Sequence, residues 1–351
     1  MIFRRKKYFL LLVLSVLLLG FYKCKPEFSV NSNSEPFTVV YGLLSASEES
    51  QYIKIFKSFL TEGNAYDVAK DINQYSYIDS IEVYLNEYSA NNPSPRKIPL
   101  DTTTTIPKDS GVFLYPTQIL YTTNAVLNRD CTYELVVFNP YTNNVTKTKL
   151  PFALAGNVRI SRPMGPDDIS ITDRDINFVF YTGKNTTMYQ LLIKYYYTED
   201  LVDNTSRHPA PVIWTLGAPV EDMTAKEGIE KGYFASGTNF FRRIAESIHD
   251  DANVRSRHTD SIVLEIHSAA KDWGLYLKSN IPSTGINQDK LHYSNMEAYN
   301  VETKEEKYAM GMVSSREVTT KRYRDLTIVD GSRDSLFHGR YTKHLKFTDI
   351  Y

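Results

Sequence analysis

The sequence predicts a mainly β protein, with an N-terminal immunoglobulin-like or fibronectin-like sandwich and a second β-rich domain that carries one packed α-helix. The chain has 26 Tyr and 17 Phe but only 16 Gly in 351 residues. Aromatic side chains fit a pleated, half-buried surface, so this composition favours strands. Many short segments alternate apolar and polar residues, whereas only one long segment repeats its apolar residues at helical spacing.

The N-terminal residues 1–23 predict a signal peptide. A basic patch at residues 4–7 precedes an almost unbroken run of Leu, Val and aromatic residues at 8–22. A run of about fifteen apolar residues is shorter than the roughly twenty that a membrane-spanning helix needs. Positive charge before a short apolar run is typical of secretion signals, so we expect export.

Cys24 stands directly after the apolar run and is the candidate lipidation site. Two or three acyl chains on this residue would anchor the protein durably to a membrane. Residues 24–36 are rich in Ser and Asn and predict a flexible tether. An uncleaved N-terminal anchor is the alternative, because residues 21–23 are bulky and charged where signal peptidases prefer small side chains.

Charge and cysteine content limit the class of protein. The formal net charge is −1, but the first 23 residues hold five basic and no acidic residues, so the remainder has 35 basic against 41 acidic residues. This acidic balance argues against nucleic acid as a partner, since phosphate binding needs clustered Lys and Arg. The only other cysteine is Cys131, so acylation of Cys24 would exclude a disulfide, and we expect Cys131 to be a small buried side chain.

Residues 37–152 predict the sandwich, because about seven short strands separated by turns are typical of that fold. A short helix is expected around residues 65–70. A long loop is expected over residues 91–108, where four prolines exclude a central strand. Strands are expected at residues 37–44, 52–60, 81–86, 111–115, 118–121, 132–139 and 145–150.

Residues 153–351 predict the second β-rich domain. Apolar residues at positions 240, 241, 244, 245 and 248 recur at helical spacing, which predicts one amphipathic helix near 239–253. Strands are expected around residues 158–160, 176–180, 189–195, 211–216, 262–266, 273–277 and 307–314.

Three stretches carry a resemblance to a known family. They are Val40-Tyr41-Gly42-Leu43-Leu44 with Tyr52-Ile53-Lys54-Ile55, then Glu62-Gly63-Asn64-Ala65-Tyr66-Asp67-Val68-Ala69, and finally Gly285-Ile286-Asn287-Gln288 through Tyr293-Ser294-Asn295-Met296-Glu297 to Gly311-Met312-Val313-Ser314-Ser315-Arg316. Their order and spacing resemble a family of uncharacterised Bacteroidota lipoproteins with a domain of unknown function, over nearly the whole mature chain. The sequence departs from that family at residues 298–307, where a charged insertion replaces a compact segment.

The resemblance implies a location in the outer membrane, on its periplasmic or outer face. It also implies a role as an accessory of a TonB-dependent transporter. The family has no assigned catalytic residues, so the resemblance transfers none to this sequence.

The sequence contains no pattern that identifies a catalytic, cofactor or metal site. All seven histidines follow Arg207, and none forms a His-x-x-x-His pair. There is no Gly-x-Ser-x-Gly motif, and Gly183-Lys184 lacks the upstream glycine of a phosphate loop. Four Asp residues at 167–175 match no loop of known calcium-ligand spacing. We therefore expect neither cofactor nor metal.

Three aromatic residues of the second domain, Tyr196, Trp214 and Tyr233, are candidate ligand contacts. Their rings could stack on a sugar or peptide. Residues 195–197 are three consecutive tyrosines on an expected strand, so their side chains must point to both faces. Packing in the core is the competing interpretation for all three candidates.

These observations predict a non-enzymatic binding or assembly module that is lipid-anchored in the outer membrane, with the membrane and a transporter or other surface protein as partners. Loops on strand scaffolds are common recognition sites. Two alternatives remain open. A surface hydrolase of glycans or peptides would need two convergent carboxylates in a deep aromatic cleft. A structural or adhesive surface protein would instead present a flat exposed patch.

Overall fold

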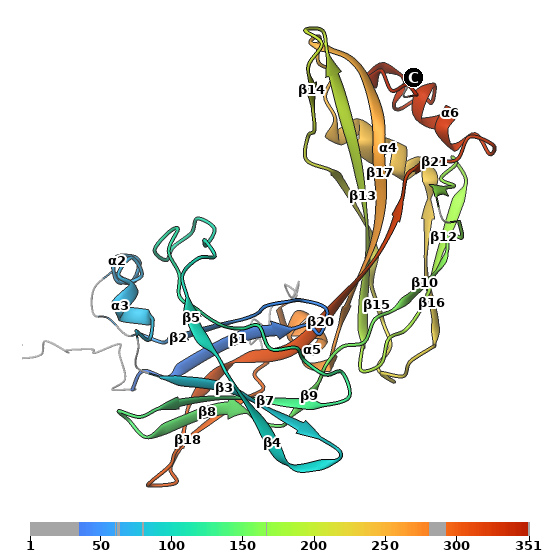
Figure 1. Cartoon of the computed structure of the whole chain (residues 1–351). Coiled ribbons are helices and arrows are strands. Elements are labelled where there is room, and N and C mark those ends of the chain that lie inside the picture. The colour runs from blue at the N-terminus through green and yellow to red at the C-terminus, as the bar shows by residue number, and fades with distance from the viewer. Residues whose placement is uncertain are drawn as a thin grey trace, which may run out of the picture.

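The computed structural model describes residues 35–349, except Leu60, Glu62, Gly63, Asp79, Ser80, Pro166 and residues 281–292. The expected signal peptide, Cys24 and most of the expected tether lie outside the described residues. The protein is mainly β, as predicted, and has two lobes set at an angle (Figure 1). We call residues 35–154 with 293–315 the lower lobe, and residues 155–269 with 316–349 the upper lobe.

The lower lobe is a two-sheet sandwich, which confirms the predicted fold of this part. Its core lies between the sheets and includes Ile53, Leu85, Tyr133 and Leu135, all fully buried. One sheet contains β1 (Thr38–Leu44), β2 (Gln51–Lys57), β5 (Asp101–Thr103) and β6 (Leu120–Thr123). The facing sheet contains β3 (Glu82–Ser89), β4 (Asn92–Pro99), β7 (Thr132–Asn139), β8 (Asn144–Thr148), β9 (Phe152–Ala153), β18 (Met296–Asn300) and β19 (Glu306–Lys307). Short helices α2 (Ala65–Val68) and α3 (Ile72–Tyr75) follow β2 in the chain.

The upper lobe is built on two long antiparallel strands, β13 (Met188–Leu201) and β17 (Val254–Ala269). Helix α4 (Gly237–Ser247) covers one face of these strands and buries Phe240, Phe241 and Ile244, which confirms the predicted amphipathic helix. The remaining strands are β10 (Arg159–Arg162), β11 (Asp168–Ile169), β12 (Asp175–Tyr181), β14 (Ser206–Arg207), β15 (Val212–Glu221), β16 (Glu230–Ser236) and β21 (Asp325–Leu326). Helix α6 (Ser332–Phe337) and the 3-10 helix η1 (Lys343–Leu345) close the lobe.

A single long strand, β20 (Ala309–Tyr323), belongs to both lobes. Its first half pairs in parallel with β1, and its second half pairs antiparallel with β17. A nine-stranded sheet therefore runs through the whole molecule in the order β14-β13-β17-β20-β1-β2-β6-β5, with β15 beside β13.

The expected division at 152/153 is corrected by this topology. Strand β18 pairs with β8, and Met296, Ala298, Ala309 and Val313 belong to the core of the lower lobe. The segment 296–315 therefore completes the first sandwich rather than the second domain. Sequence periodicity reports that a strand has a buried face, but it does not report which sheet the strand joins.

Three local predictions were also wrong. The expected strand at 273–277 is helix α5 (Lys271–Asn280), in which Trp273 and Tyr276 stack at helical spacing with centroids 5.5 Å apart. Residues 111–115 form no strand. The expected loop at 91–108 instead contains β4 and β5, which lie at sheet edges, where strand prolines are tolerated.

Candidate functional site

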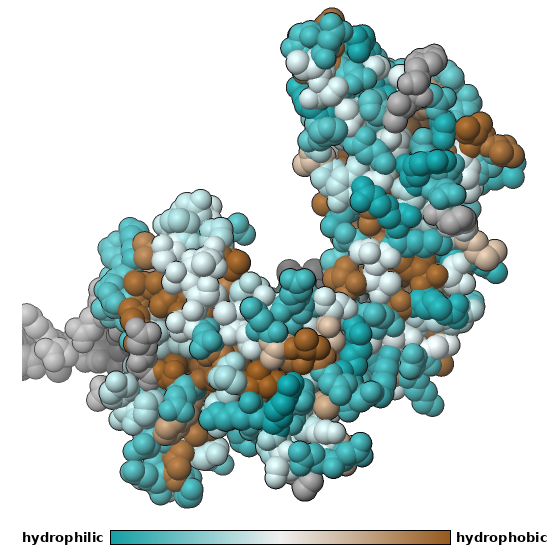
Figure 2. Space-filling model, in the orientation of Figure 1, coloured by the Kyte–Doolittle hydropathy of each residue, from teal (hydrophilic) through white to brown (hydrophobic). Residues whose placement is uncertain are grey.

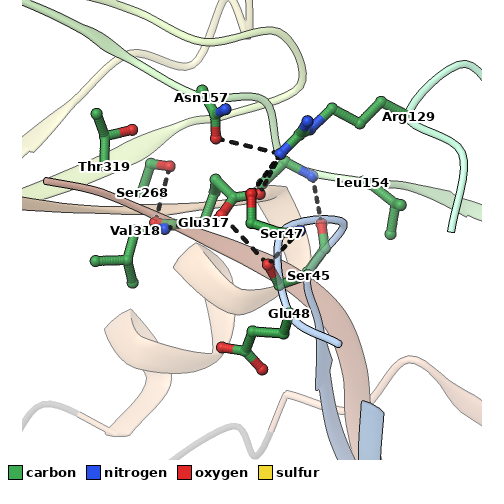
Figure 3. A network of polar contacts seen from close by, with 12 residues as sticks. Ser45, Ser47, Glu48, Arg129, Leu154, Asn157, Ser268, Glu317, Val318 and Thr319 are labelled. Carbon is green, nitrogen blue, oxygen red and sulfur yellow. Dashed lines mark hydrogen bonds and ion pairs between the residues drawn. The ribbon is translucent and has the colours of Figure 1, made fainter. Parts of the chain in front are cut away.

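The two lobes meet at a polar junction around the middle of β20 (Figure 3). The ladder with β1 ends at the Leu44–Ser315 pair, and the ladder with β17 ends at the Ala269–Arg316 pair. Glu317 follows directly, and its side chain is 2% exposed. The junction thus places a carboxylate inside the protein at the point where the strand changes partners.

Two side chains of the lower lobe contact the Glu317 carboxylate. Ser45 Oγ, in the turn after β1, donates to Glu317 Oε1 at 3.2 Å. Arg129 Nη2, before β7, lies 2.8 Å from Glu317 Oε2. The same nitrogen also donates to Ser47 Oγ at 2.8 Å and to Asn157 Oδ1 at 3.2 Å. Arg129 therefore joins the lower-lobe turn, Asn157 of the upper lobe and β20 through one guanidinium group.

Two neighbours of Glu317 add further interlobe contacts. Arg316 Nη2 donates to Glu48 Oε1 at 2.9 Å, across the junction and partly exposed to solvent. Ser315 Oγ accepts from the backbone N–H of Ala155 at 2.7 Å and donates to the carbonyl oxygen of Ala153 at 3.0 Å. The Arg316–Glu48 pair and the bond from Ala155 to Ser315 thus join the two lobes, and the backbone N–H of Ala270 donates to the Ser315 carbonyl oxygen beside them.

The upper lobe has a second polar surface on the sheet face opposite α4. Tyr195 packs on Phe240 of α4, so the next residue, Tyr196, faces away from the helix. Lys194, Val263 and Arg322 are direct cross-strand neighbours and share that face. We call this surface the open face.

Charged groups on the open face are paired with one another. Lys194 Nζ lies 2.7 Å from Glu265 Oε1, and His267 Nε2 lies 3.0 Å from Glu265 Oε2. Burial alone would raise the pKa of Glu265, but the hydrogen bonds and charges of Lys194 and His267 lower it. The Arg322 guanidinium lies 6.0 Å from the centroid of the Tyr196 ring. The open face is a mixed charged and aromatic surface, and both oxygens of its Glu265 carboxylate are paired.

The three candidate ligand contacts do not share a surface. Trp214 is paired with the buried Ile193, and its ring lies 6.0 Å from that of Phe240 on the α4 side. Tyr233 is 6% exposed, and its hydroxyl donates to the carbonyl oxygen of Tyr189 at 2.7 Å. Of the three, only Tyr196 lies on the open face. Core packing therefore accounts for Trp214 and Tyr233, and residue type alone does not distinguish these two positions from Tyr196.

The tip of the upper lobe contains a buried ion-pair cluster. Arg257 is 0% exposed, and its Nε lies 2.8 Å from Glu199 Oε1. Arg257 also donates to the carbonyl oxygen of Leu345 at 2.7 Å and to that of His249 at 3.0 Å. Arg207 bonds the other oxygen of Glu199. This cluster fixes the C-terminal segment against β17.

A Thr-His-Asp group beside this cluster does not have the connectivity of a nucleophilic triad. Thr198 Oγ1 lies 2.7 Å from His208 Nδ1 and donates to both oxygens of Asp260 at 2.8 and 2.9 Å. In a triad the acid orients the histidine, and the histidine activates the hydroxyl. Here the hydroxyl lies between the acid and the histidine, so its proton is held by Asp260.

A pocket of about 340 Å³ opens at the end of the lower-lobe sandwich where the described chain begins. Its lining includes Phe37 and Tyr308, whose rings meet edge to face at 4.6 Å. Lys307 Nζ lies 3.3 Å from Glu35 Oε2 at its rim. The N-terminal segment therefore joins the protein at the lower lobe.

The described part of the chain contains neither a metal-binding cluster nor a membrane-spanning helix. Within the ranges given above, no group of three or more His, Cys, Asp or Glu side chains is placed to hold a metal ion. No helix in that part of the chain is long and apolar enough to cross a membrane.

The sequence did not reveal the polar junction. Glu317 and Arg129 are 188 positions apart, and each occurs in a locally unremarkable charged segment. Only the partner change of β20 brings them together. The expected strand at 307–314 covers only the first part of β20, and its residues do not indicate that the strand continues or that it pairs with two different strands.

Comparisons with known proteins give no family. No family model matches the sequence, and no curated protein matches it. Among solved structures, the C-terminal globular domain of an oligosaccharyltransferase from Pyrococcus abyssi is 12% identical over 65% of this chain, with a TM-score of 0.22. This chain spans 46% of that structure. The calcium-binding domain CBD12 of CALX1.1 is 9% identical over 82% of this chain and 99% of its own, with a TM-score of 0.18. The protein is thus similar only remotely to these two structures.

Proposed function

We propose that the protein is an exported lipoprotein of the outer membrane that acts as a non-enzymatic binding or assembly module. Cys24 would carry the lipid, and a transporter or another surface protein would be the partner. The anchor follows from residues 1–24, which combine positive charge, an apolar run and a cysteine.

The continuous nine-stranded sheet is the observation that supports a display role. It joins the lower lobe, where the described chain begins at Glu35, to the tip of the upper lobe, which lies at the far end of the molecule (Figure 1). The long strands β13 and β17 carry the upper-lobe loops away from the lower lobe. A scaffold of this kind suits presentation of a surface at a distance from a membrane.

The open face supports a polar recognition surface in the upper lobe. Arg322 and Thr320 are exposed there, and Tyr196 and Val263 are half-buried beside them. The space-filling view shows largely hydrophilic surface over the upper lobe, with smaller apolar areas between (Figure 2). Interfaces between proteins that associate reversibly have a similar mixture of polar and apolar surface.

Replacement of Cys24 tests the anchor. The Cys24→Ala variant, expressed in its native membrane context, is expected to lose incorporation of a labelled fatty acid and to leave the membrane fraction. Cys131→Ala is the matched control, because it removes the other cysteine, which is buried, without touching the acylation site. Its labelling and fractionation should equal those of the wild type. Retention of label and membrane association by Cys24→Ala would refute the lipid anchor.

A further inference from the structure

Within the nine-stranded sheet, the junction between the lobes is one strand wide. Helix α5 packs beside this strand, with Tyr276 against Tyr41 of the lower lobe and Lys278 paired with Glu221 of the upper lobe. The β1 ladder ends at Ser315 and the β17 ladder ends at Arg316, which are adjacent residues of β20. Among the described strands, none pairs with β20 on both sides of this point. Elsewhere in a sheet, neighbouring strands fix one another's direction through repeated hydrogen bonds. Here the ladders alone leave the angle between the lobes free to change.

The two lobes also have separate cores. The lower-lobe core surrounds Leu85 and Tyr133, and the upper-lobe core surrounds Ile193 and Phe240. The two sets of buried residues have no member in common. A change of angle at the junction would therefore leave each core packed. Such motion about a few residues between packed bodies is typical of a hinge.

The contacts of Glu317 with Ser45 and Arg129 add a buried restraint to those of the ladders and of α5. Glu317 belongs to the part of β20 that pairs with the upper lobe, whereas Ser45 and Arg129 belong to the lower lobe. The carboxylate is 2% exposed, so hydrogen bonds from these partners must replace those that water would supply. A buried charge that loses its partner is left uncompensated, which is energetically costly. Separating Glu317 from Arg129 is therefore unfavourable while both residues are present.

We propose that β20 is a hinge at residues 315–317 and that the Glu317–Arg129 pair is its latch, which holds the lobes at one angle. Opening the latch lets the upper lobe swing about β20 without unfolding either lobe. A partner that contacts both lobes and binds one form more tightly than the other would then shift the population toward the angle of that form. The proposal does not depend on the lipid anchor or on the identity of a partner.

Distance measurements between the lobes test the latch. Spin labels are placed at Ser94→Cys on β4 and Phe234→Cys on β16, both at exposed positions, in the full chain carrying Cys24→Ala and Cys131→Ala. Pulsed electron resonance then gives the distribution of distances between the labels. Glu317→Gln and Arg129→Met are the test variants. Lys194→Met is the matched control, because it breaks the Lys194–Glu265 ion pair within the upper lobe.

The latch predicts a distance distribution broadened by about twofold in both test variants and unchanged in Lys194→Met. Hydrogen exchange by mass spectrometry must show that β7 and β13 keep their protection in the same samples, which separates hinge motion from unfolding. Unchanged distributions in both test variants would overturn the proposal. Loss of protection throughout both lobes would also overturn it, because the network would then be a requirement for folding.

Discussion

Arg257 is a charged side chain with no access to solvent, and its environment explains why it is tolerated. The guanidinium group bonds Glu199 and the carbonyl oxygens of Leu345 and His249. Glu199 in turn bonds Arg207. A buried charge is stable only when its partners replace water, and this cluster meets that condition.

Replacement of Arg257 by Met is therefore expected to lower the free energy of unfolding by about 3–5 kcal/mol, since one oxygen of the buried Glu199 carboxylate and two carbonyl groups lose their donor. Urea denaturation measures the change. Arg174→Met, at an exposed position of the upper lobe, should change stability by less than about 0.5 kcal/mol. A loss for Arg257→Met no larger than that for Arg174→Met would show that the cluster contributes little.

At the scale of elements, most strands with one buried face were predictable. The strand expected at 132–139 is β7, and the amphipathic helix expected near 239–253 is α4, because each repeats apolar residues with the period of its backbone. Helix α5 was missed because Trp273, Leu275 and Leu277 alternate as a strand would. In a ten-residue apolar segment, strand and helix periods are hard to distinguish.

Edge elements and pairing partners were not predictable. Pro95 and Pro99 suggested a loop, yet β4 tolerates them because it lies at the edge of its sheet. The split pairing of β20 depends on contacts with β1 and β17, which lie far away in the sequence. Local sequence patterns do not indicate contacts between distant segments. The polar junction depends on such contacts, so it was not predicted.

The start of helix α6 offers a pH-dependent prediction. Burial would raise the pKa of Asp330, but hydrogen bonds from Ser170, Ser332 and Thr327 lower the pKa to about 2. The depressed pKa means that the ionised form stabilises the folded state above the unfolded pKa of about 4, and that this contribution is lost as the pH falls through about 2.

Asp330→Asn should therefore be less stable than the wild type by on the order of 1 kcal/mol at about pH 6, a figure discounted because the residue is exposed. The difference should shrink between about pH 4 and pH 2 as the wild-type carboxylate becomes protonated. Chemical denaturation of both proteins across this range measures it. A difference independent of pH would exclude the proposed role of the carboxylate.

At the scale of the whole molecule, the protein is a bent two-lobed frame joined by one shared strand. The mainly β class and the sandwich followed from the sequence, whereas the bend did not. Of the candidate contacts, Tyr196 reaches the open face, while Trp214 and Tyr233 pack inside. The anchor and the binding role are proposals about the whole molecule. In this proposal the lower lobe is tethered to the membrane, and the upper lobe is presented to a partner.

Site-specific photo-crosslinking in intact cells tests the binding role most directly. A benzoylphenylalanine is placed at Thr320 on the open face or, as a control, at the exposed Glu246 on α4, which covers the opposite face. The account predicts that Thr320 captures one reproducible outer-membrane protein, that Glu246 does not, and that the purified protein cleaves no glycan or peptide substrate. No capture from Thr320, together with glycan or peptide hydrolysis by the purified protein, would contradict it.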